Sequence, residues 1–145
     1  MQCIQTIRLA LPDIKIELRM DSAFFNDEII AALEELDNVE YSISMPFAGF
    51  DELKGFIENR QRWRAMNDRF SFFEKHWKPA SWSRCHRFVF VRQKVKRPLI
   101  GPLQLDLFMP LEVGHDYTVL VTNRCRSGVG LSSWTWQSGR IIRRT

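Results

Sequence analysis

Apolar and polar residues alternate in several short segments of the chain, and this alternation predicts strands. Residues 14–20 carry apolar side chains at positions 14, 16, 18 and 20, so we expect a strand with one buried face. Residues 41–45 alternate in the same way up to Pro46, which ends the segment. Further strands are expected at residues 70–73, 87–92, 103–109 and 117–122, the last apolar on both faces as in a central strand.

Two segments between these strands have the spacing of amphipathic helices. Asn26 is a candidate N-cap, and apolar side chains follow it at positions 29, 30, 33 and 36. The residues from Phe50 to Ile57 predict a second helix of about ten residues. A strand–helix–strand–helix order followed by strands predicts an α/β fold with a mixed sheet.

Composition places the chain among ordinary globular proteins. Its 145 residues, 45% of them hydrophobic, suit one domain and exclude wholesale disorder. No apolar run approaches the roughly 18 residues that a membrane span needs, and no signal-peptide pattern opens the chain. The cysteines, Cys3, Cys85 and Cys125, include no C-x-x-C pair, which favours reduced thiols and a cytoplasmic location.

Charge divides the chain into two unlike halves. Residues 1–59 hold four Lys or Arg and twelve Asp or Glu, a balance of −8, whereas residues 60–145 hold seventeen basic and five acidic residues, a balance of +12. A basic half is typical of a protein that binds a polyanion, with nucleic acid as the first candidate. The alternative is a solvated basic surface without a specific partner.

Asp21 is the strongest candidate for chemistry. It follows the strand predicted at residues 14–20 and precedes a loop and a helix, the place where α/β sheets carry functional groups. An Asp at such a junction also serves commonly as a cap or turn residue. Both readings stay open for this residue taken alone.

The surrounding sequence resembles the DDE transposases of bacterial insertion sequences. The matching segments are Arg19-Met20-Asp21-Ser22-Ala23-Phe24-Phe25 and, after the helix, residues 39–44, 50–55, 77–79, 88–92, 104–108 and 121–124. In one large group of these enzymes the second catalytic Asp lies in an Arg-x-Asp-Ser-(Gly/Ala)-Phe motif at a strand end. The resemblance covers about residues 8–124 and is specific because order and spacing agree along that length.

The resemblance implies an RNase H-like core, here a partial catalytic domain at residues 1–123, interrupted by a β-rich insertion at about residues 63–115. In the family, three carboxylates hold two Mg²⁺ or Mn²⁺ ions that promote DNA strand cleavage and transfer during transposition. Asp21 corresponds to the second carboxylate, and is thus the expected catalytic and metal-binding residue. The family's partners are the transposon DNA ends.

Two of the three carboxylates have no counterpart in this chain. The family's first Asp belongs on a strand upstream of the matching region, and Asp13 lies in a Pro-Asp turn that suits the role poorly. The final Glu belongs on a helix after Asn123, yet no acidic residue follows Asp116. We therefore expect a transposase fragment that is inactive alone and holds no metal ion stably.

Basic residues interleaved with tryptophans suggest a DNA-facing surface in the second half. The expected contacts to phosphates are Arg60, Arg62, Arg64, Lys78, Arg84 and Arg87, with exposed tryptophans stacking on unpaired bases. The alternative is that Trp63, Trp77 and Trp82 pack a small core. An alternative function follows from this surface: a non-catalytic protein that binds DNA, or that joins full-length transposase and interferes with it.

Residues 124–145 differ in character from the rest of the chain. They contain five arginines, no lysine and no acidic residue, with Trp134 and Trp136 among serines and glycines. A disordered basic tail is one interpretation. A shifted reading frame is the other, and we favour it because two tryptophans are unusual in evolved disorder.

Overall fold

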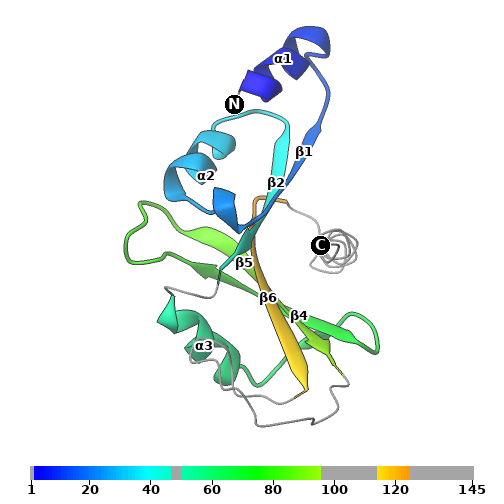
Figure 1. Cartoon of the computed structure of the whole chain (residues 1–145), viewed down its shortest axis with the longest axis vertical. Helices are drawn as coiled ribbons and strands as arrows, with labels where there is room; N and C mark the ends of the chain where they lie inside the picture. The colour runs from blue at the N-terminus through cyan, green and yellow to red at the C-terminus, as the bar shows by residue number, and fades with distance from the viewer. Residues whose placement is uncertain (1, 47–49, 96–113, 125–145) are drawn as a thin grey trace.

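A single six-stranded mixed sheet organises the parts of the chain that the structure describes, which are residues 2–46, 50–95 and 114–124 of a computed structural model (Figure 1). The strand order across the sheet is β1-β2-β6-β5-β4-β3. The elements, in chain order, are α1 (Gln2–Ala10), β1 (Ile16–Met20), the 3₁₀ helix η1 (Ser22–Phe24), α2 (Asp27–Glu34), β2 (Val39–Met45), α3 (Asp51–Glu58), β3 (Arg64–Ala65), β4 (Phe70–Trp77), β5 (His86–Lys94) and β6 (His115–Thr122).

The first half of the fold is a parallel β1–α2–β2 unit. Ile16 lies opposite Val39 and Met20 opposite Ile43, so both strands run in the same direction with α2 as the crossover. Every other neighbouring pair in the sheet is antiparallel, and β6 joins the two halves by pairing with both β2 and β5. The strands β3 to β6 therefore continue the sheet that β1 and β2 begin.

Local sequence explains where α2 begins and ends. The Asn26 side chain accepts a hydrogen bond from the Glu28 backbone N–H (2.8 Å), which satisfies a donor at the start of the helix. Asp27 and Glu28 occupy the first turn, where their charges complement the helix dipole. Asn38 has a φ of 53°, in the left-handed region that Asn tolerates, and it turns the chain into β2.

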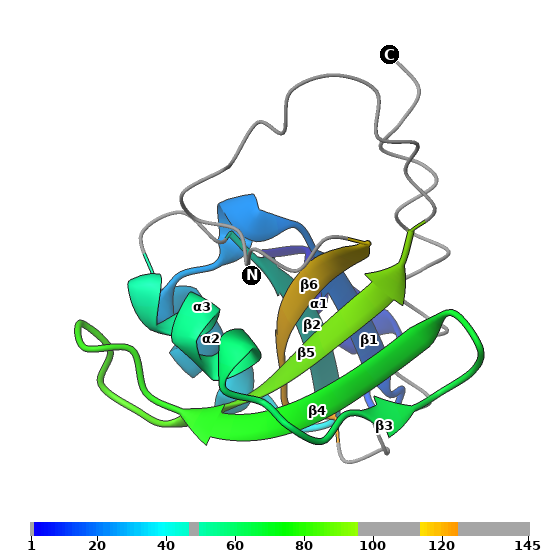
Figure 2. The same ribbon diagram turned by 90° about the horizontal axis from the view of Figure 1, so that it is seen from below.

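The main hydrophobic core lies between the sheet and the helices α2 and α3, which cover the same face (Figure 2). Buried residues of the helices, such as Ile30 and Leu53, pack in one cluster with Ile43, Phe90 and Val119 of the strands. The rings of Phe73 and Phe90 stack with centroids 4.4 Å apart.

A second, smaller cluster lies on the opposite face of the sheet. It joins Phe72, Val89 and Val91, with Met66 and Phe70 packed against them. Because successive residues of a strand face opposite sides, Phe72 and its neighbour Phe73 belong to different clusters. The central strands are thus buried on both faces.

The predicted α/β class with a mixed sheet is confirmed, and the RNase H-like assignment stays a prediction. The strands expected at residues 14–20, 41–45, 70–73, 87–92 and 117–122 are all present, with bounds shifted by a few residues, and so are both helices. The strand expected at residues 103–109 and nearly all of the tail at 124–145 lie outside the described residues. The helix α1 and the two-residue strand β3 were not expected.

Candidate functional site

Asp21 is the first residue after β1, at the carboxyl end of the parallel unit, and it is exposed. Its Oδ1 accepts a hydrogen bond from the Ala23 backbone N–H (3.0 Å), so its side chain caps the 3₁₀ helix η1. The cap role that the sequence left open for Asp21 is therefore one that its side chain fills. A carboxylate offers about four lone-pair sites, so capping leaves it chemically able to bind a cation as well.

The described residues around Asp21 do not supply the ligands of a two-metal centre. Among the residues that the structure describes, no group of three or more His, Cys, Asp or Glu side chains is placed to hold a metal ion. Mg²⁺ and Mn²⁺ need several oxygen ligands, and Asp21 supplies a single carboxylate here. We therefore derive no catalytic step through a metal ion in this chain.

The six expected DNA contacts fall into two groups. Arg60, Arg62 and Arg64 lie on and before β3, whereas Lys78, Arg84 and Arg87 lie in the β4–β5 loop and at the start of β5. Arg64 is opposite Phe72 on β4, and Arg87 is opposite His76. Those two positions of β4 are four residues apart, or about 13 Å at roughly 3.3 Å per residue. The six side chains therefore flank β4 at two separate places.

Each group has one member whose side-chain contacts are described and two exposed members. Arg87 forms an ion pair with Glu74 (Nη2 to Oε2, 2.9 Å) and donates from Nη1 to the backbone oxygen of Arg124. The guanidinium of Arg60 lies 4.8 Å from the ring centroid of Phe73, and its Nε donates to the Arg62 carbonyl. Arg62, Arg64, Lys78 and Arg84 are exposed.

The three tryptophans pack against the main core. Trp82 is buried, and its ring lies 4.7 Å from that of Phe25. Trp63 and Trp77 are half-buried against the same cluster, and Arg92 covers the ring of Trp63 at 4.5 Å. The packing supports the interpretation that these tryptophans belong to a hydrophobic core rather than to a DNA-facing surface. The core they join is the main one, between the sheet and the helices α2 and α3.

A buried histidine joins α2 to the sheet, and the sequence reading missed it. The His86 side chain is 1% exposed, with Nδ1 2.9 Å from Glu34 Oε1 and Nε2 3.8 Å from Asp27 Oδ1. Tyr41 donates its hydroxyl to the same Glu34 oxygen (2.8 Å), and burial, followed by the Glu34 contacts, raises the pKa of Tyr41. The Ser83 backbone N–H donates to Asp27 (2.8 Å), which lowers the pKa of that carboxyl.

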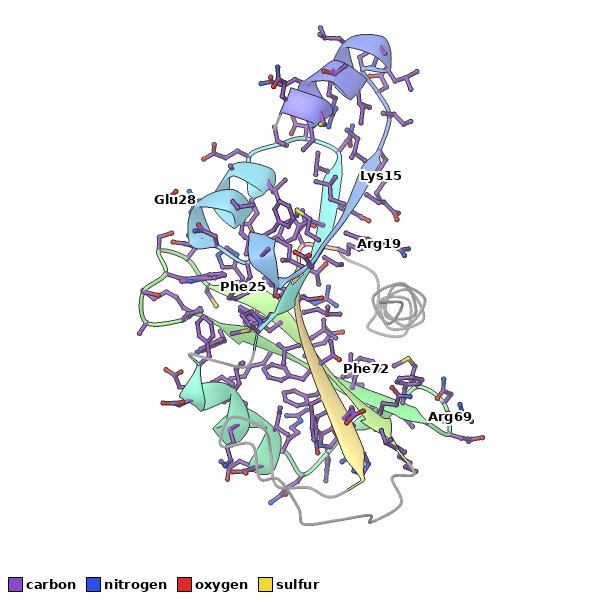
Figure 3. The ribbon with its side chains drawn as sticks, viewed as in Figure 1. Lys15, Arg19, Phe25, Glu28, Arg69 and Phe72 are labelled. Carbon is purple, nitrogen blue, oxygen red and sulfur yellow. The ribbon has the colours of Figure 1, made fainter. Side chains whose placement is uncertain are left out.

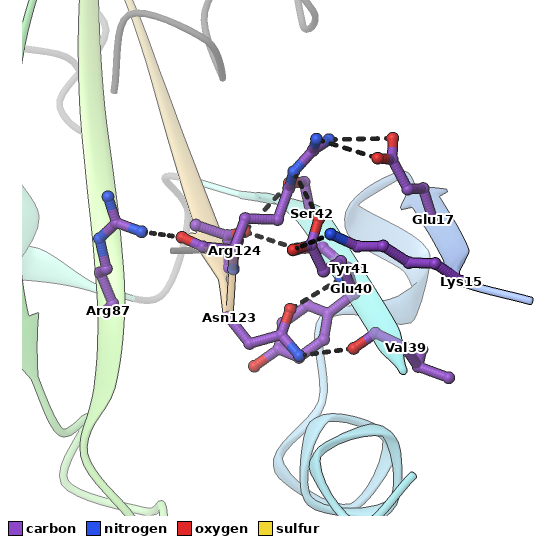
Figure 4. Close-up of polar contacts among 10 residues, drawn as sticks. Lys15, Glu17, Val39, Glu40, Tyr41, Ser42, Arg87, Asn123 and Arg124 are labelled. Carbon is purple, nitrogen blue, oxygen red and sulfur yellow. Dashed lines mark hydrogen bonds and ion pairs between the residues drawn. The ribbon is translucent and has the colours of Figure 1, made fainter. Parts of the chain in front are cut away.

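Arg124 is the second buried charge that sequence reading did not place. Its guanidinium is held between β1 and β2 by Glu17 and by Glu40, whose Oε2 lies 3.1 Å from Nε in an ion-pair geometry (Figure 4). Lys15 also contacts Glu40, at 2.7 Å. The alternation of β1 and β2 places Glu17 and Glu40 on one face of the sheet as directly paired residues. Two paired carboxylates of this kind are the sequence feature that could have indicated a bound cation.

A groove of about 450 Å³ lies between α3 and β4. Phe56 and Phe73 supply apolar surface, and Lys75 lies over the Phe56 ring at 4.4 Å. Glu52 and Arg60 line the same groove, so its charges are mixed in sign. The groove is separate from Asp21 and offers no arrangement of nucleophile and base.

None of the helices in the described ranges is long and apolar enough to cross a membrane. Comparisons of the chain with protein-family models, with curated proteins and with solved structures found no match. The resemblance carried by residues 8–124 is therefore the basis on which a function is proposed.

Proposed function

We propose that this chain is part of the catalytic domain of a DDE transposase with an RNase H-like core, and that Asp21 is the second of the three carboxylates. The observation that carries the proposal is the place of Asp21 within its motif. The carboxylate is exposed directly after the parallel strand β1, ahead of η1 and α2. Functional groups of open α/β sheets concentrate at the carboxyl ends of such strands.

The chain alone is proposed to be inactive in strand cleavage and transfer. A pair of divalent ions needs several carboxylates, and neither a first Asp nor a final Glu has a counterpart at the matching positions of this sequence. What the chain contributes by itself is the position of one carboxylate, fixed by β1 and by the capping bond to Ala23.

The DNA that flanks the reading frame tests this proposal most directly. Translation of the flanks in all frames is expected to reveal an upstream strand that bears an Asp. It is also expected to reveal, in another frame, a continuation from Asn123 into a helix that bears a Glu. Flanks that encode neither piece would overturn the proposal and would make residues 125–145 an authentic basic segment.

A second candidate function, a non-catalytic DNA-binding protein, rests on the basic surface. Residues 60–95 hold ten Lys or Arg and only Asp68 and Glu74 as acids, a balance of +8. Arg64, on β3, and Arg84, in the β4–β5 loop, are exposed. Side chains of this kind neutralise phosphates without reading sequence, so binding is expected to weaken steeply with salt. In the same candidate function, the chain would join full-length transposase and interfere with its activity.

Fluorescence anisotropy with a labelled duplex separates the second candidate from a merely basic surface. Arg64→Glu and Arg84→Glu are each expected to weaken retention of the duplex and to lower its salt dependence. Lys54→Glu, on α3, changes the net charge by the same amount and is expected to leave binding unchanged. Equal effects of the three variants would show that only overall charge matters, and would remove this candidate.

A further inference from the structure

The strand β1 forms one end of the sheet, and its outer edge has no strand partner within the described part of the chain. The strand at the other end, β3, has two residues, whereas β1 has five. A short edge strand resists pairing with another chain, so β1 is the edge that is able to accept a further strand.

The backbone of β1 presents alternate residues to its open edge. The Ile16 N–H donates to the Asn38 carbonyl (2.9 Å), which places the polar backbone groups of Ile16, and of every second residue after it, toward β2. In a strand the intervening residues direct their N–H and C=O groups to the other edge. Glu17 and Arg19 are therefore the β1 residues whose backbone faces outward.

Exposed apolar side chains are concentrated in the segment of the chain that contains β1. In the ranges that the structure describes, the large hydrophobic residues with the greatest exposure all lie within residues 7–24: Ile7 (41%), Leu9 (88%), Leu11 (53%), Ile14 (44%) and Phe24 (47%). Ile14 precedes β1 and Phe24 follows it, so apolar surface flanks both ends of the open strand. Exposed apolar side chains concentrated in one segment are typical of an interaction site.

The charged side chains along this edge alternate in sign. Lys15, Glu17, Arg19 and Asp21 follow one another at every second position, and Figure 3 shows Lys15 and Arg19 projecting from the same side of β1, away from α2. From Lys15 to Asp21 the signs run plus, minus, plus, minus, and in the opposite direction they run minus, plus, minus, plus. Two antiparallel copies of this segment can therefore place opposite charges face to face. We propose that β1 pairs antiparallel with β1 of a second copy of this chain, with the two-fold axis at Leu18, and so forms a continuous sheet across the dimer.

The charge pattern selects this register over its neighbours. In an antiparallel ladder, residues with outward backbone groups must face each other, and a ladder that pairs at least three residues of β1 (Ile16–Met20) then has its two-fold axis at Glu17, Leu18 or Arg19. An axis at Glu17 or Arg19 places like charges directly opposite, which destabilises a ladder. An axis at Leu18 sets Glu17 opposite Arg19 of the second copy, and Lys15 opposite its Asp21.

The apolar face of β1 agrees with the same register. Leu18 faces Leu18 of the second copy, and Ile16 faces its Met20, on the side of the strand that packs toward the core. The Ile14 end of one strand meets the Phe24 end of the other. Charges on an edge usually prevent pairing because they meet like charges, but here the single favoured register makes every facing pair opposite in sign.

The existing contacts of Glu17 are compatible with the pairing. Glu17 binds Arg124 through both carboxylate oxygens and is 38% exposed at its side chain. Each oxygen has further acceptor capacity for a second guanidinium. The inference does not depend on the proposed transposase origin, because it uses only the edge of β1 and is read out as an oligomeric state.

Sedimentation equilibrium of the full 145-residue chain tests the pairing. The chain is expected to be a dimer, and Arg19→Glu is expected to raise the dimer dissociation constant at least tenfold because it creates two Glu–Glu pairs. Arg64→Glu makes the same charge change on β3, at the opposite edge, and is the matched control that leaves the dimer intact. A wild-type chain that is monomeric at all concentrations, or an Arg19→Glu dimer as tight as wild type, would overturn the proposal.

A mixing experiment covers the case in which Arg19→Glu fails to fold. Lys15→Asp and Asp21→Lys are each expected to be monomeric, because each homodimer opposes like charges at two pairs. Mixed in equal amounts they are expected to form a heterodimer, in which both pairs are again opposite in sign. No heterodimer from two folded variants would refute the register. A monomer whose Glu17 and Arg19 amides resist hydrogen exchange would show instead that another segment of the chain covers the edge.

Discussion

The guanidinium of Arg124 binds the carboxylate of Glu17 through two hydrogen bonds, Nη1 to Oε2 at 3.2 Å and Nη2 to Oε1 at 3.1 Å. The two residues are 107 positions apart in the sequence, and Arg124 is 4% exposed. A two-pronged pair of this kind fixes both direction and distance. It ties the chain beyond β6 to the strand β1 at the sheet edge, across the intervening strand β2.

Removal of this buried cation is expected to destabilise the fold strongly. Arg124→Ala leaves Glu17 and Glu40 facing each other without the charge between them, so we expect the free energy of unfolding to fall by about 3 kcal/mol. Urea denaturation followed by circular dichroism measures the change. Lys15→Ala is the control, because its contact with Glu40 is half-exposed and its loss is expected to cost less than about 1 kcal/mol. Equal losses for the two variants would contradict this assignment.

Asn123 extends the sheet with its side chain, and its truncation is expected to be costly. Its Oδ1 accepts from the Tyr41 backbone N–H (2.8 Å) and its Nδ2 donates to the Val39 carbonyl (2.9 Å), as a further strand residue would (Figure 4). Asn123→Ala leaves both backbone groups without these partners, and we expect a loss of about 2 kcal/mol in urea denaturation. Asn123→Asp sets a carboxylate oxygen against the Val39 carbonyl oxygen in place of the donor, so its loss is expected to be at least as large. A loss near zero for Asn123→Ala would show that the two side-chain hydrogen bonds contribute nothing to stability.

The sequence predicted the parts of the fold that depend on local pattern. The apolar positions of β1 and the cap at Asn26 follow from alternation and from side-chain chemistry within a few residues, and they are present where expected. The pairing of β2 with β6 could not be predicted, since it depends on contacts such as that between Ser42 and Thr122, 80 positions apart.

The candidate site shows the same division between local and distant information. The exposure of Asp21 at a strand end follows from the local pattern, whereas the separation of Arg64 from Arg87 along β4 depends on the hairpin register. Arg124 was grouped with the tail because its neighbours in sequence are unlike the rest of the chain. In the structure its partners are Glu17 and Glu40, which no local pattern of residues 124–145 reveals. The boundary of the tail at residue 124 stays a prediction, but Arg124 itself is bound to the sheet.

Tyr41 is expected to make the protein less stable at high pH. Burial, then the hydrogen bond to Glu34, raises the pKa of Tyr41 above its ordinary value of 10.0. Its stabilising contribution is complete below that value and is lost as pH rises, because the unfolded tyrosine releases a proton that the folded one keeps. The free energy of unfolding is expected to fall by about 1.4 kcal/mol for each pH unit above 10. Urea denaturation between pH 9 and pH 11 measures the slope, and Tyr41→Phe should remove this part of it. An unchanged slope in the variant would contradict the prediction.

Asp27 is expected to contribute to unfolding in acid. The Ser83 backbone hydrogen bond is the largest cause that holds the pKa of this carboxyl below its ordinary value of 3.8. The contribution to stability is therefore present above pH 3.8 and is lost as pH falls below it. Asp27→Asn is expected to flatten the decline of stability in this window, as measured by urea denaturation between pH 2 and pH 5. Glu28→Gln, in the same helical turn but exposed, is the control and should leave the decline unchanged. A decline that both variants alter equally would point to the helix dipole as the cause.

Asp21 is expected to contribute to the stability of the isolated chain, and the isolated chain is expected not to cleave DNA. Incubation of a supercoiled plasmid with the chain and Mg²⁺ or Mn²⁺ is expected to yield no nicked or linear product, because one carboxylate cannot hold the metal pair. Asp21→Ala removes the cap of η1 and is expected to lower the free energy of unfolding by about 1 kcal/mol, while Asp21→Asn keeps an oxygen that accepts the Ala23 N–H and is expected to cost less. Cleavage that is present in the wild-type chain and lost in Asp21→Asn, a variant that keeps the cap, would show that further ligands assemble around Asp21. That result would replace the proposed inactive fragment with an active enzyme.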